Sequence, residues 1–355
     1  MSPTTAQRAF AGQAGVVRGW VVRLGPWSLR VDPRLVLVGV VLLLAVLVLA
    51  VLTLTTGTIE LTVGDVIGAL FGHGDERTLR TVVGRRLPRL LTALLVGGSL
   101  GVAGAVFQSL SRNALGSPDI IGFTTGAATG AVIQILLFDG SVAAVAASAI
   151  AGGVLTALVV YALARKDGVS GGMRLVLVGI GVAAILAAVT SFLIVRADLS
   201  DADVVQRWEA GSLIGRGWPH ALSVLAAVAI LIPAILVCRR AVTYLEMGDD
   251  SARALGVPAE AYRFGALLLA VTLTGVAVAA TGPIAFIALA APQIVTRLTR
   301  RGGVSIIPTF LLGGLFLSAA DLVSQQVDLG VRTPVGLITS VIGGLYLIWL
   351  LARRA

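Results

Sequence analysis

The stretch RLPRLLTALLVGGSLGVAGAVFQSLSRNALGSPDIIG, at Arg86–Gly122, decides the fold. It opens with a basic turn, continues as an apolar run, and closes with a polar turn that contains an Arg-Asn pair and a Pro-Asp pair. The apolar run is about as long as an α-helix that crosses a bilayer, which needs roughly 20 apolar residues. Small residues recur in it at every fourth position, namely Gly97, Gly101 and Ala105. This spacing predicts a membrane helix that a second helix can approach closely.

The composition of the whole chain also predicts a membrane protein. Of its 355 residues, 57% are hydrophobic and 13% are charged, whereas soluble domains carry about 25% charged residues. The single cysteine, Cys238, excludes an internal disulfide. A net charge of +9 would suggest nucleic acid as the partner of a soluble protein. In this chain it reports topology instead, and no nucleic-acid partner is expected.

Apolar runs of spanning length predict an all-α polytopic protein with about ten transmembrane helices. Residues 1–34 are basic, lack a signal peptide, and form an N-terminal segment; residues 35–355 form the transmembrane domain. The helices are predicted at 35–56, 88–110, 119–137, 141–164, 173–195, 219–238, 264–281, 283–297, 305–322 and 334–352.

The distribution of basic residues predicts the orientation. With the N-terminus in the cytoplasm, 18 of the 27 basic residues fall on the cytoplasmic side, as the positive-inside rule requires. Both termini are then cytoplasmic. Five of the other arginines crowd into one outer loop: Arg77, Arg80, Arg85, Arg86 and Arg89. They form either a docking patch for an acidic partner, since Arg pairs bidentately with carboxylates, or a solvated loop whose charge nearby Asp and Glu residues offset.

Catalytic and metal-binding patterns are missing from the sequence. Lys166 is the only lysine and is followed by Asp167, so the chain lacks the usual phosphate-binding loop for ATP. His73 and His220 lie far apart without acidic or thiol neighbours at metal-ligand spacing, and both are expected in loops. No enzyme activity, metal site or cofactor is therefore expected in this chain.

Ionisable residues are nearly absent from the predicted helices. Asp321 is the main exception, and it lies near a predicted helix end. Proton- or sodium-driven transporters usually keep such groups near the membrane midplane, so this pattern disfavours a secondary transporter. Three glutamines are expected to form hydrogen bonds between helices: Gln108, Gln134 and Gln293.

Several motifs together resemble the permease subunits of iron-siderophore and cobalamin ABC importers. Within the opening stretch they are Arg-Leu-Pro-Arg at 86–89 and the turn at 112–122. Four further segments follow in the family's order: 175–181 (LVLVGIG), 245–256 (LEMGDDSARALG), 281–293 (TGPIAFIALAAPQ) and 333–344 (TPVGLITSVIGG). The resemblance spans about residues 35–352 and implies a type II ABC importer permease fold. Gln293 stands where the family more often has His. Family members with Gln at this position resemble ferric-catecholate permeases of the ferric-enterobactin type.

The resemblance also implies roles for particular residues. Arg86 and Arg89 would dock an acidic rim of an extracytoplasmic substrate-binding protein. The cytoplasmic gate would comprise Asn113, Leu115, Gly172 and Met173, although the family often has a small hydroxyl residue at the last two positions.

The segment at 239–263 has balanced charges and reads either as a surface helix bridging two spans or as a coupling helix for an ATPase. The resemblance favours the coupling helix, which would comprise Gly248, Asp249, Asp250, Ser251, Ala252, Arg253, Ala254, Leu255 and Gly256.

The function implied is import of a ferric siderophore across the bacterial cytoplasmic membrane. The expected partners are two ATP-binding subunits, which would hold ATP and Mg²⁺, a second copy of this permease or a homologous one, the binding protein and the lipid bilayer. Two alternatives stay open. One is a cobalamin or haem importer of the same class, and the other is a secondary transporter that works without an ATPase.

Overall fold

The computed structural model describes residues 20–24, 27–138, 140–165, 172–300, 302–326 and 333–352. Helices corresponding to all ten predicted spans lie within these residues. They are α2 (Pro33–Thr55), α5 (Leu87–Ser111), α6 (Phe123–Phe138), α7 (Val142–Ala164), α8 (Gly172–Arg196), α10 (Trp218–Glu246), α12 (Ala259–Thr281), α13 (Ile287–Thr299), α14 (Ile306–Gln326) and α15 (Val335–Ala352).

Shorter elements connect these helices. They are α3 (Val63–Leu70), α4 (Glu76–Thr81), the π-helical turn η1 (Val82–Arg86), α9 (Leu199–Glu209) and α11 (Asp249–Ala254). Ahead of α2, the strands β1 (Trp20–Leu24) and β2 (Trp27–Val31) pair as an antiparallel hairpin. The all-α prediction therefore holds for the membrane domain, and the N-terminal segment adds one hairpin.

In the described part of the chain, seven helices are long and apolar enough to cross a membrane by themselves: α2, the continuous α4–η1–α5, α7, α8, α10, α12 and α14. α6 and α15 are shorter apolar helices, and α13 has only 13 residues. The shorter lengths have local causes. α6 begins at Phe123 rather than 119, because the polar turn ends at Gly122 with a φ of +89°. α13 begins at Ile287 rather than 283, after positive φ values at Gly282 and Phe286.

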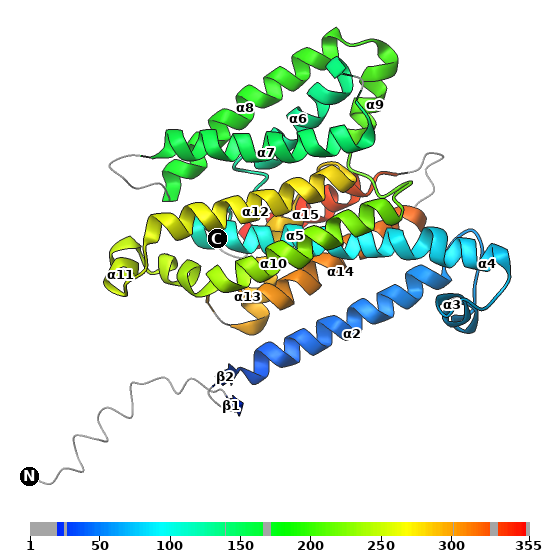
Figure 1. Cartoon of the computed structure of the whole chain (residues 1–355), viewed down its shortest axis with the longest axis horizontal. Coiled ribbons are helices and arrows are strands. Elements are labelled where there is room, and N and C mark those ends of the chain that lie inside the picture. Colours follow the sequence, from blue (N-terminus) through cyan, green and yellow to red (C-terminus); the bar gives the residue numbers. More distant parts are fainter. Residues whose placement is uncertain are drawn as a thin grey trace, which may run out of the picture.

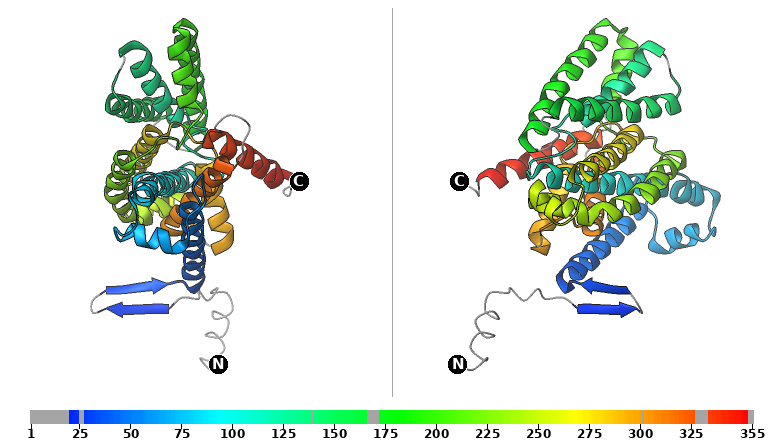
Figure 2. Two further views of the ribbon diagram at one scale, coloured as in Figure 1. Left: turned by 90° about the vertical axis from the view of Figure 1, so that its right-hand side faces the viewer. Right: turned by 60° about the vertical axis from the view of Figure 1, so that its left-hand side comes forward.

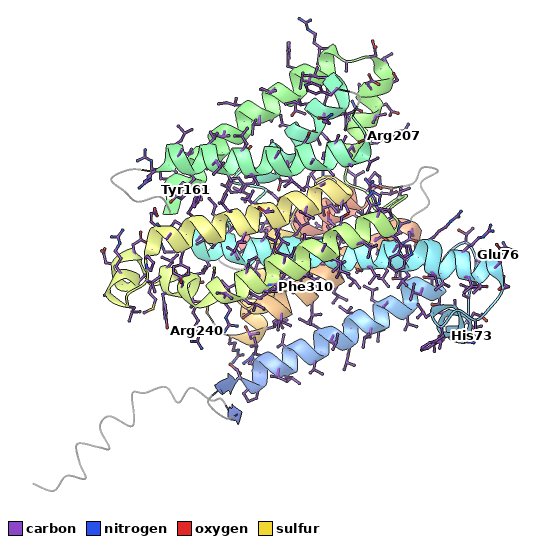
Figure 3. The ribbon with its side chains drawn as sticks, viewed as in Figure 1. His73, Glu76, Tyr161, Arg207, Arg240 and Phe310 are labelled. Atoms are coloured by element: carbon purple, nitrogen blue, oxygen red, sulfur yellow. The ribbon has the colours of Figure 1, made fainter. Side chains whose placement is uncertain are left out.

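α10 and α12 extend furthest beyond their predicted apolar runs. α10 continues to Glu246 instead of 238, and α12 begins at Ala259 instead of 264. Their extra turns carry charged residues, including Arg240, whose side chain lies near the α11 end of the molecule in Figure 3. Hydropathy reports only the part of a helix that suits hydrocarbon, so it misses turns that extend past the apolar core.

The helix α5 forms the centre of the bundle and packs against α14, α13, α12 and α10 (Figure 1). A methyl group added at Gly97 would lie 2.3 Å from the carbonyl oxygen of Gly313, and one at Gly101 would lie 2.8 Å from that of Thr309. The predicted small-residue face is therefore confirmed against α14. Gly104 approaches α13 even more closely, since a methyl group there would lie 1.7 Å from the Ala288 oxygen.

The remaining helices flank this centre. α6, α7, α8 and α9 form a separate layer that packs on α12, while α2 lies against α14 on the other side (Figures 1 and 2). The long helices run roughly along one axis. One end of the bundle carries α11, the beginning of α2 and the end of α15, and is called the α11 end here. The opposite end carries α3, α4 and α9 and is called the α9 end.

Candidate functional site

The first predicted gate turn closes α5 at the α11 end. Arg112 caps the helix in the left-handed conformation, with a φ of 51°, and the backbone N–H of Asn113 donates to the Gln108 carbonyl at 3.1 Å. The Asn113 Oδ1 then accepts the backbone N–H of Leu115 at 2.9 Å. This Asx turn holds the loop in one shape. It leaves Leu115 exposed at the surface.

The second predicted gate turn lies where α8 begins. Gly172 has a φ of +63°, which favours glycine, and Met173 is exposed. The guanidinium of Arg112 lies beside this turn, since a methyl group added at Gly172 would lie 3.9 Å from its Nη2. One added at Gly248 would lie 3.7 Å from its Nη1. The fold thus brings both predicted gate turns and the start of the predicted coupling helix within reach of one side chain.

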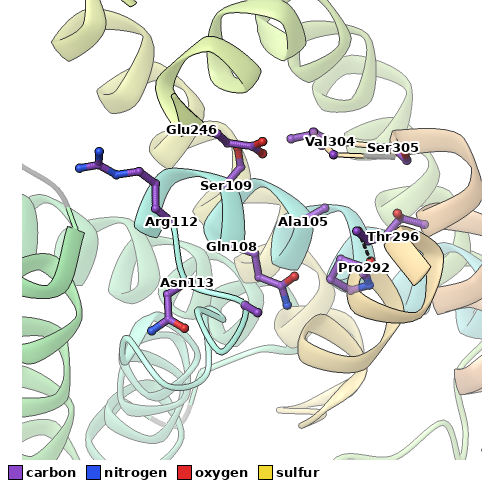
Figure 4. A pocket seen from close by; sticks show the side chains of 14 residues that line it. Ala105, Gln108, Ser109, Arg112, Asn113, Glu246, Pro292, Thr296, Val304 and Ser305 are labelled. Carbon is purple, nitrogen blue, oxygen red and sulfur yellow. Dashed lines mark hydrogen bonds between the residues drawn. The ribbon is translucent and has the colours of Figure 1, made fainter. Parts of the chain in front are cut away.

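A cavity of about 340 Å³ opens beside the first gate turn (Figure 4). Polar side chains from α5, the turn that follows it, α10 and α13 line it, among them Gln108, Arg112, Asn113, Glu246 and Thr296. The lining combines both charges with neutral hydrogen-bonding groups, so it is hydrophilic without one dominant sign of charge.

Gln108 and Gln134 form hydrogen bonds between helices, as predicted, whereas Gln293 bonds to a loop. The Gln108 side chain donates to the Leu289 carbonyl of α13 at 3.0 Å, and Gln293 donates to the Ala114 carbonyl in the gate turn at 2.6 Å. Gln134 of α6 accepts a hydrogen bond from Ser148 of α7 at 3.0 Å. Two of these bonds therefore anchor α13 to α5 and to the loop that carries Asn113 and Leu115.

The predicted coupling segment forms a short helix with one buried and one exposed side. Gly248 precedes α11 with a φ of 104°, and Gly256 follows it with a φ of 78°, so glycine backbones bound it at both ends. Ala252 is buried, whereas Asp250 is exposed and lies 3.5 Å from Arg253. The other exposed positions are Ser251, Arg253, Ala254, Leu255 and Gly256. Asp249 differs, because its carboxylate turns inward to Arg263.

The two predicted docking arginines lie at the α9 end, and both are engaged within the chain. Arg86 donates to the carbonyls of Leu54 at 2.7 Å and Ile59 at 2.5 Å, which closes the end of α2. Arg89 holds Asp321 of α14 with two hydrogen bonds of 2.9 and 2.8 Å. The Asp321 side chain is only 2% exposed and that of Arg89 is 23% exposed. A docking role for these arginines stays a prediction, and the structure adds a role inside the subunit.

The sequence contained a signal for the partner of Arg89, because an acid such as Asp321 in an apolar helix requires a counter-charge.

The other arginines of the predicted outer loop are more accessible. Arg77 and Arg85 are exposed and make no side-chain hydrogen bond or ion pair with the described residues, while Arg80 pairs with Glu76 on the surface of α4 (Figure 3).

A second cavity, of about 240 Å³, lies where α6, α9 and α15 meet the break before α13. Asp119 and Glu209 both line it. Thr124 donates a hydrogen bond of 2.7 Å to the Asp119 carboxylate. Burial raises the pKa of Glu209, at the end of α9.

Histidines and acids do not assemble into a metal site in the described residues, where no group of three or more His, Cys, Asp or Glu side chains is suited to hold an ion. His73 lies in the loop between α3 and α4, as predicted (Figure 3). The loop prediction is wrong for His220, which lies in the first turn of α10, 3.3 Å from Arg216.

The sequence matches the FecCD transport family over residues 42–353. It is 44% identical over 298 residues to the ferric enterobactin transport system permease protein FepG of Escherichia coli, covering 84% of this chain and 90% of that protein. The iron(3+)-hydroxamate import system permease protein FhuG of Bacillus subtilis is 37% identical, with 80% and 87% covered. The cobalamin import system permease protein BtuC of Halobacterium salinarum is 35% identical, with 79% and 76% covered.

Among solved structures, the fold is similar to an inward-facing conformation of a metal-chelate type ABC transporter. The TM-score is 0.79 at 26% sequence identity, and the match covers 90% of this chain and 99% of that one.

Proposed function

The chain belongs to the FecCD transport family of membrane permeases, and from this we propose that it is the translocation subunit of an ATP-driven importer of a ferric siderophore. The similarity to FepG carries the proposal, because 44% identity extends over 90% of that protein. Relatives of this kind are subunits of multi-protein transport systems, so the alternative of a secondary transporter working alone is set aside.

The substrate is tested by uptake into cells from which this chain has been deleted. Iron-55 would be supplied as ferric enterobactin, as a ferric hydroxamate and as ferric citrate, with labelled cobalamin in parallel. The expected result is a loss of ferric enterobactin uptake that the intact chain restores. Normal uptake of every ferric chelate together with a loss of cobalamin uptake would assign the protein to the alternative that its similarity to BtuC favours.

The α11 end is proposed to face the cytoplasm and to contact two ATP-binding subunits, which carry Mg²⁺ and ATP. The exposed side of α11, with Asp250, Ser251 and Leu255, offers both charged and apolar contacts to a groove. The glycines that bound this helix separate it from α10 and α12, so it forms a distinct protrusion. With this orientation α2 begins and α15 ends on the cytoplasmic side.

The gate is proposed to lie between the turns at Asn113–Leu115 and Gly172–Met173. Leu115 and Met173 are both exposed in one subunit, and apolar side chains that meet those of a second permease would close a passage to water. Methionine is a suitable component because its flexible thioether adapts to partners of different shape. The second permease is either another copy of this chain or a homologue.

The α9 end is proposed to receive a substrate-binding protein from outside the membrane. Among the five arginines of the predicted outer loop, Arg77 and Arg85 are exposed and make no side-chain contact with the described residues that an acidic partner would have to break. Arg86 and Arg89 remain part of the proposed surface, since both are only half-buried.

A further inference from the structure

The joint between α11 and α12 contains a buried arginine. The Arg263 side chain is 3% exposed. Its Nη2 donates to the Asp249 carboxylate of α11 at 2.5 Å, and its Nη1 donates to the Glu260 carboxylate of α12 at 2.7 Å. Asp249 is 14% exposed and therefore contributes little to the outer surface of the helix. One planar guanidinium thus binds both helices at once, which is the geometry that Arg provides and Lys does not.

Without this ion pair, the main-chain connection between the two helices would be easy to bend. It passes through Gly256, with a φ of 78° and no side chain within reach of a methyl group added there. Backbone hydrogen bonds from Gly256 to Arg253, of 2.9 Å, and from Val257 to Ala252, of 3.0 Å, close the end of α11, and the Ala252 side chain is buried. Neither of these two bonds reaches α12. The ion pair between Asp249 and Arg263 joins the two helices directly and so restrains the orientation of one on the other.

The helix that Arg263 joins to α11 is held firmly along its length. The side chains of Leu267, Val271 and Leu273 are fully buried in the bundle. At the α9 end, the Thr281 carbonyl accepts the backbone N–H of Ser212 at 2.7 Å. A methyl group added at Gly282 would lie 2.2 Å from the Trp208 oxygen. α12 is therefore packed closely along its length, and its C-terminal end is in direct contact with α9 and the chain that follows it.

We propose that Arg263 is a positioning residue that makes α11 and α12 one rigid unit, so that movement imposed on α11 by the ATP-binding subunits reaches the α9 end. This inference rests on the proposed function, because it needs ATP-binding subunits to move α11. Without the ion pair, α11 would turn about Gly256 and ATP hydrolysis would proceed with less transport.

The substitution Asp249→Asn tests this inference with little risk to folding, since Glu260 still neutralises Arg263. Asp250→Asn is the matched comparison. It makes the same chemical change one residue along, at an exposed carboxylate whose ion pair is to Arg253 within α11. Because Asp250 belongs to the proposed contact surface for the ATP-binding subunits, this comparison is used only in the distance measurement, which is made on the permease without those subunits.

The stiffness of the joint is measured first, on the full chain in lipid nanodiscs without nucleotide. Spin labels at Ser251 and Thr272, in a Cys238→Ser background, report the distance from α11 to the middle of α12 by pulsed electron resonance. The expected result is a narrow distance distribution for the chain with Asp249 and for Asp250→Asn, and a broad one for Asp249→Asn. Equal widths in all three would overturn the proposal without touching the proposed function.

Coupling is measured next, in proteoliposomes with the ATP-binding subunits and the binding protein, as iron-55 ferric enterobactin imported per ATP hydrolysed. Asp249→Asn is expected to lower this ratio at least about fivefold, the lower range of typical coupling between sites. A bis-maleimide bridge in an Asp249→Cys, Arg263→Cys double variant is expected to restore it.

An unchanged ratio in Asp249→Asn contradicts the proposal, as does a bridged variant whose ratio stays low. If Asp249→Asn does not accumulate in membranes, the bridged variant decides. If the unaltered chain does not bind an ATP-binding subunit, the proposed function is wrong. The spin-label distance distribution then remains as the test of whether Arg263 holds α11 and α12 rigidly together.

Discussion

The bond between Arg89 and Asp321 crosses from α5 to α14 at the α9 end of the bundle, and it gives Arg89 two possible tasks. Removing one partner of a buried ion pair costs about 3–5 kcal/mol, because the other charge is left uncompensated. Arg89 keeps 23% of its side chain exposed, so it can also meet a carboxylate of another protein. Reversal of Arg86 and Arg89 to Glu is therefore expected to lower uptake for two different reasons.

Two single substitutions separate these reasons. Arg89→Gln and Asp321→Asn both remove the internal ion pair, but only Arg89→Gln removes the cation that a binding protein would recognise. If Arg89 docks the partner, Arg89→Gln weakens binding of the purified binding protein while Asp321→Asn preserves it at equal membrane abundance. Binding affinity and abundance are measured together. Equal affinities in the two variants would leave Arg89 with only its role inside the subunit.

At the scale of elements, the closest contacts between helices occur at glycines, whose lack of a side chain matters more there than hydrophobicity. α5 touches α14 through Gly97 and Gly101 and touches α13 through Gly104. Between helices in lipid, apolar area is not a driving force, so close backbone approach and dispersion have to hold them together. The break before α13 contributes to this, because it lets the Ala288 carbonyl come against Gly104.

Gly104→Ala is expected to be strongly destabilising. Its methyl group would lie 1.7 Å from the Ala288 oxygen, so the cost should reach or exceed the upper end of the ~1–3 kcal/mol typical of overpacking. Gly181→Ala is the matched control, since a methyl group there meets nothing within 4 Å in another glycine-bearing apolar helix. Melting temperature in detergent and membrane abundance provide the readout. A Gly104→Ala chain as stable as Gly181→Ala would contradict the packing described.

At the scale of the whole molecule, one subunit presents large apolar faces that face either lipid or another protein. α8 is exposed along much of its length and begins at the second predicted gate turn. A gate that closes between two permeases requires α8 to lie near its counterpart. The exposed side of α2, on the opposite flank of the bundle, has no gate residue and is expected to face lipid (Figure 2).

Cysteine cross-linking between copies tests this arrangement. In a Cys238→Ser background, Ile185→Cys on α8 is expected to cross-link two permeases in membranes, whereas the equally apolar and exposed Leu44→Cys on α2 is not. The product is a band of doubled mass that a reducing agent removes. Efficient cross-linking through Leu44 alone would place the contact on the other flank. If the partner is a homologue, its corresponding helix carries the second cysteine.

The sequence by itself determined the membrane class, the positions of ten apolar helices and the close-packing face of α5. These follow from local properties: spanning length, hydropathy and the spacing of small residues along one helix. The family motifs also marked the turn that follows α5 and the segment 245–256, both of which lie at the α11 end. Tertiary structure alone decided which polar groups meet. Arg89 pairs with Asp321 far along the chain, Asp249 turns inward to Arg263, and Gln293 binds the turn that follows α5. Such pairings depend on how helices rotate and stack against one another, because a buried charge or amide has to find its partner across that packing, and no local pattern specifies it.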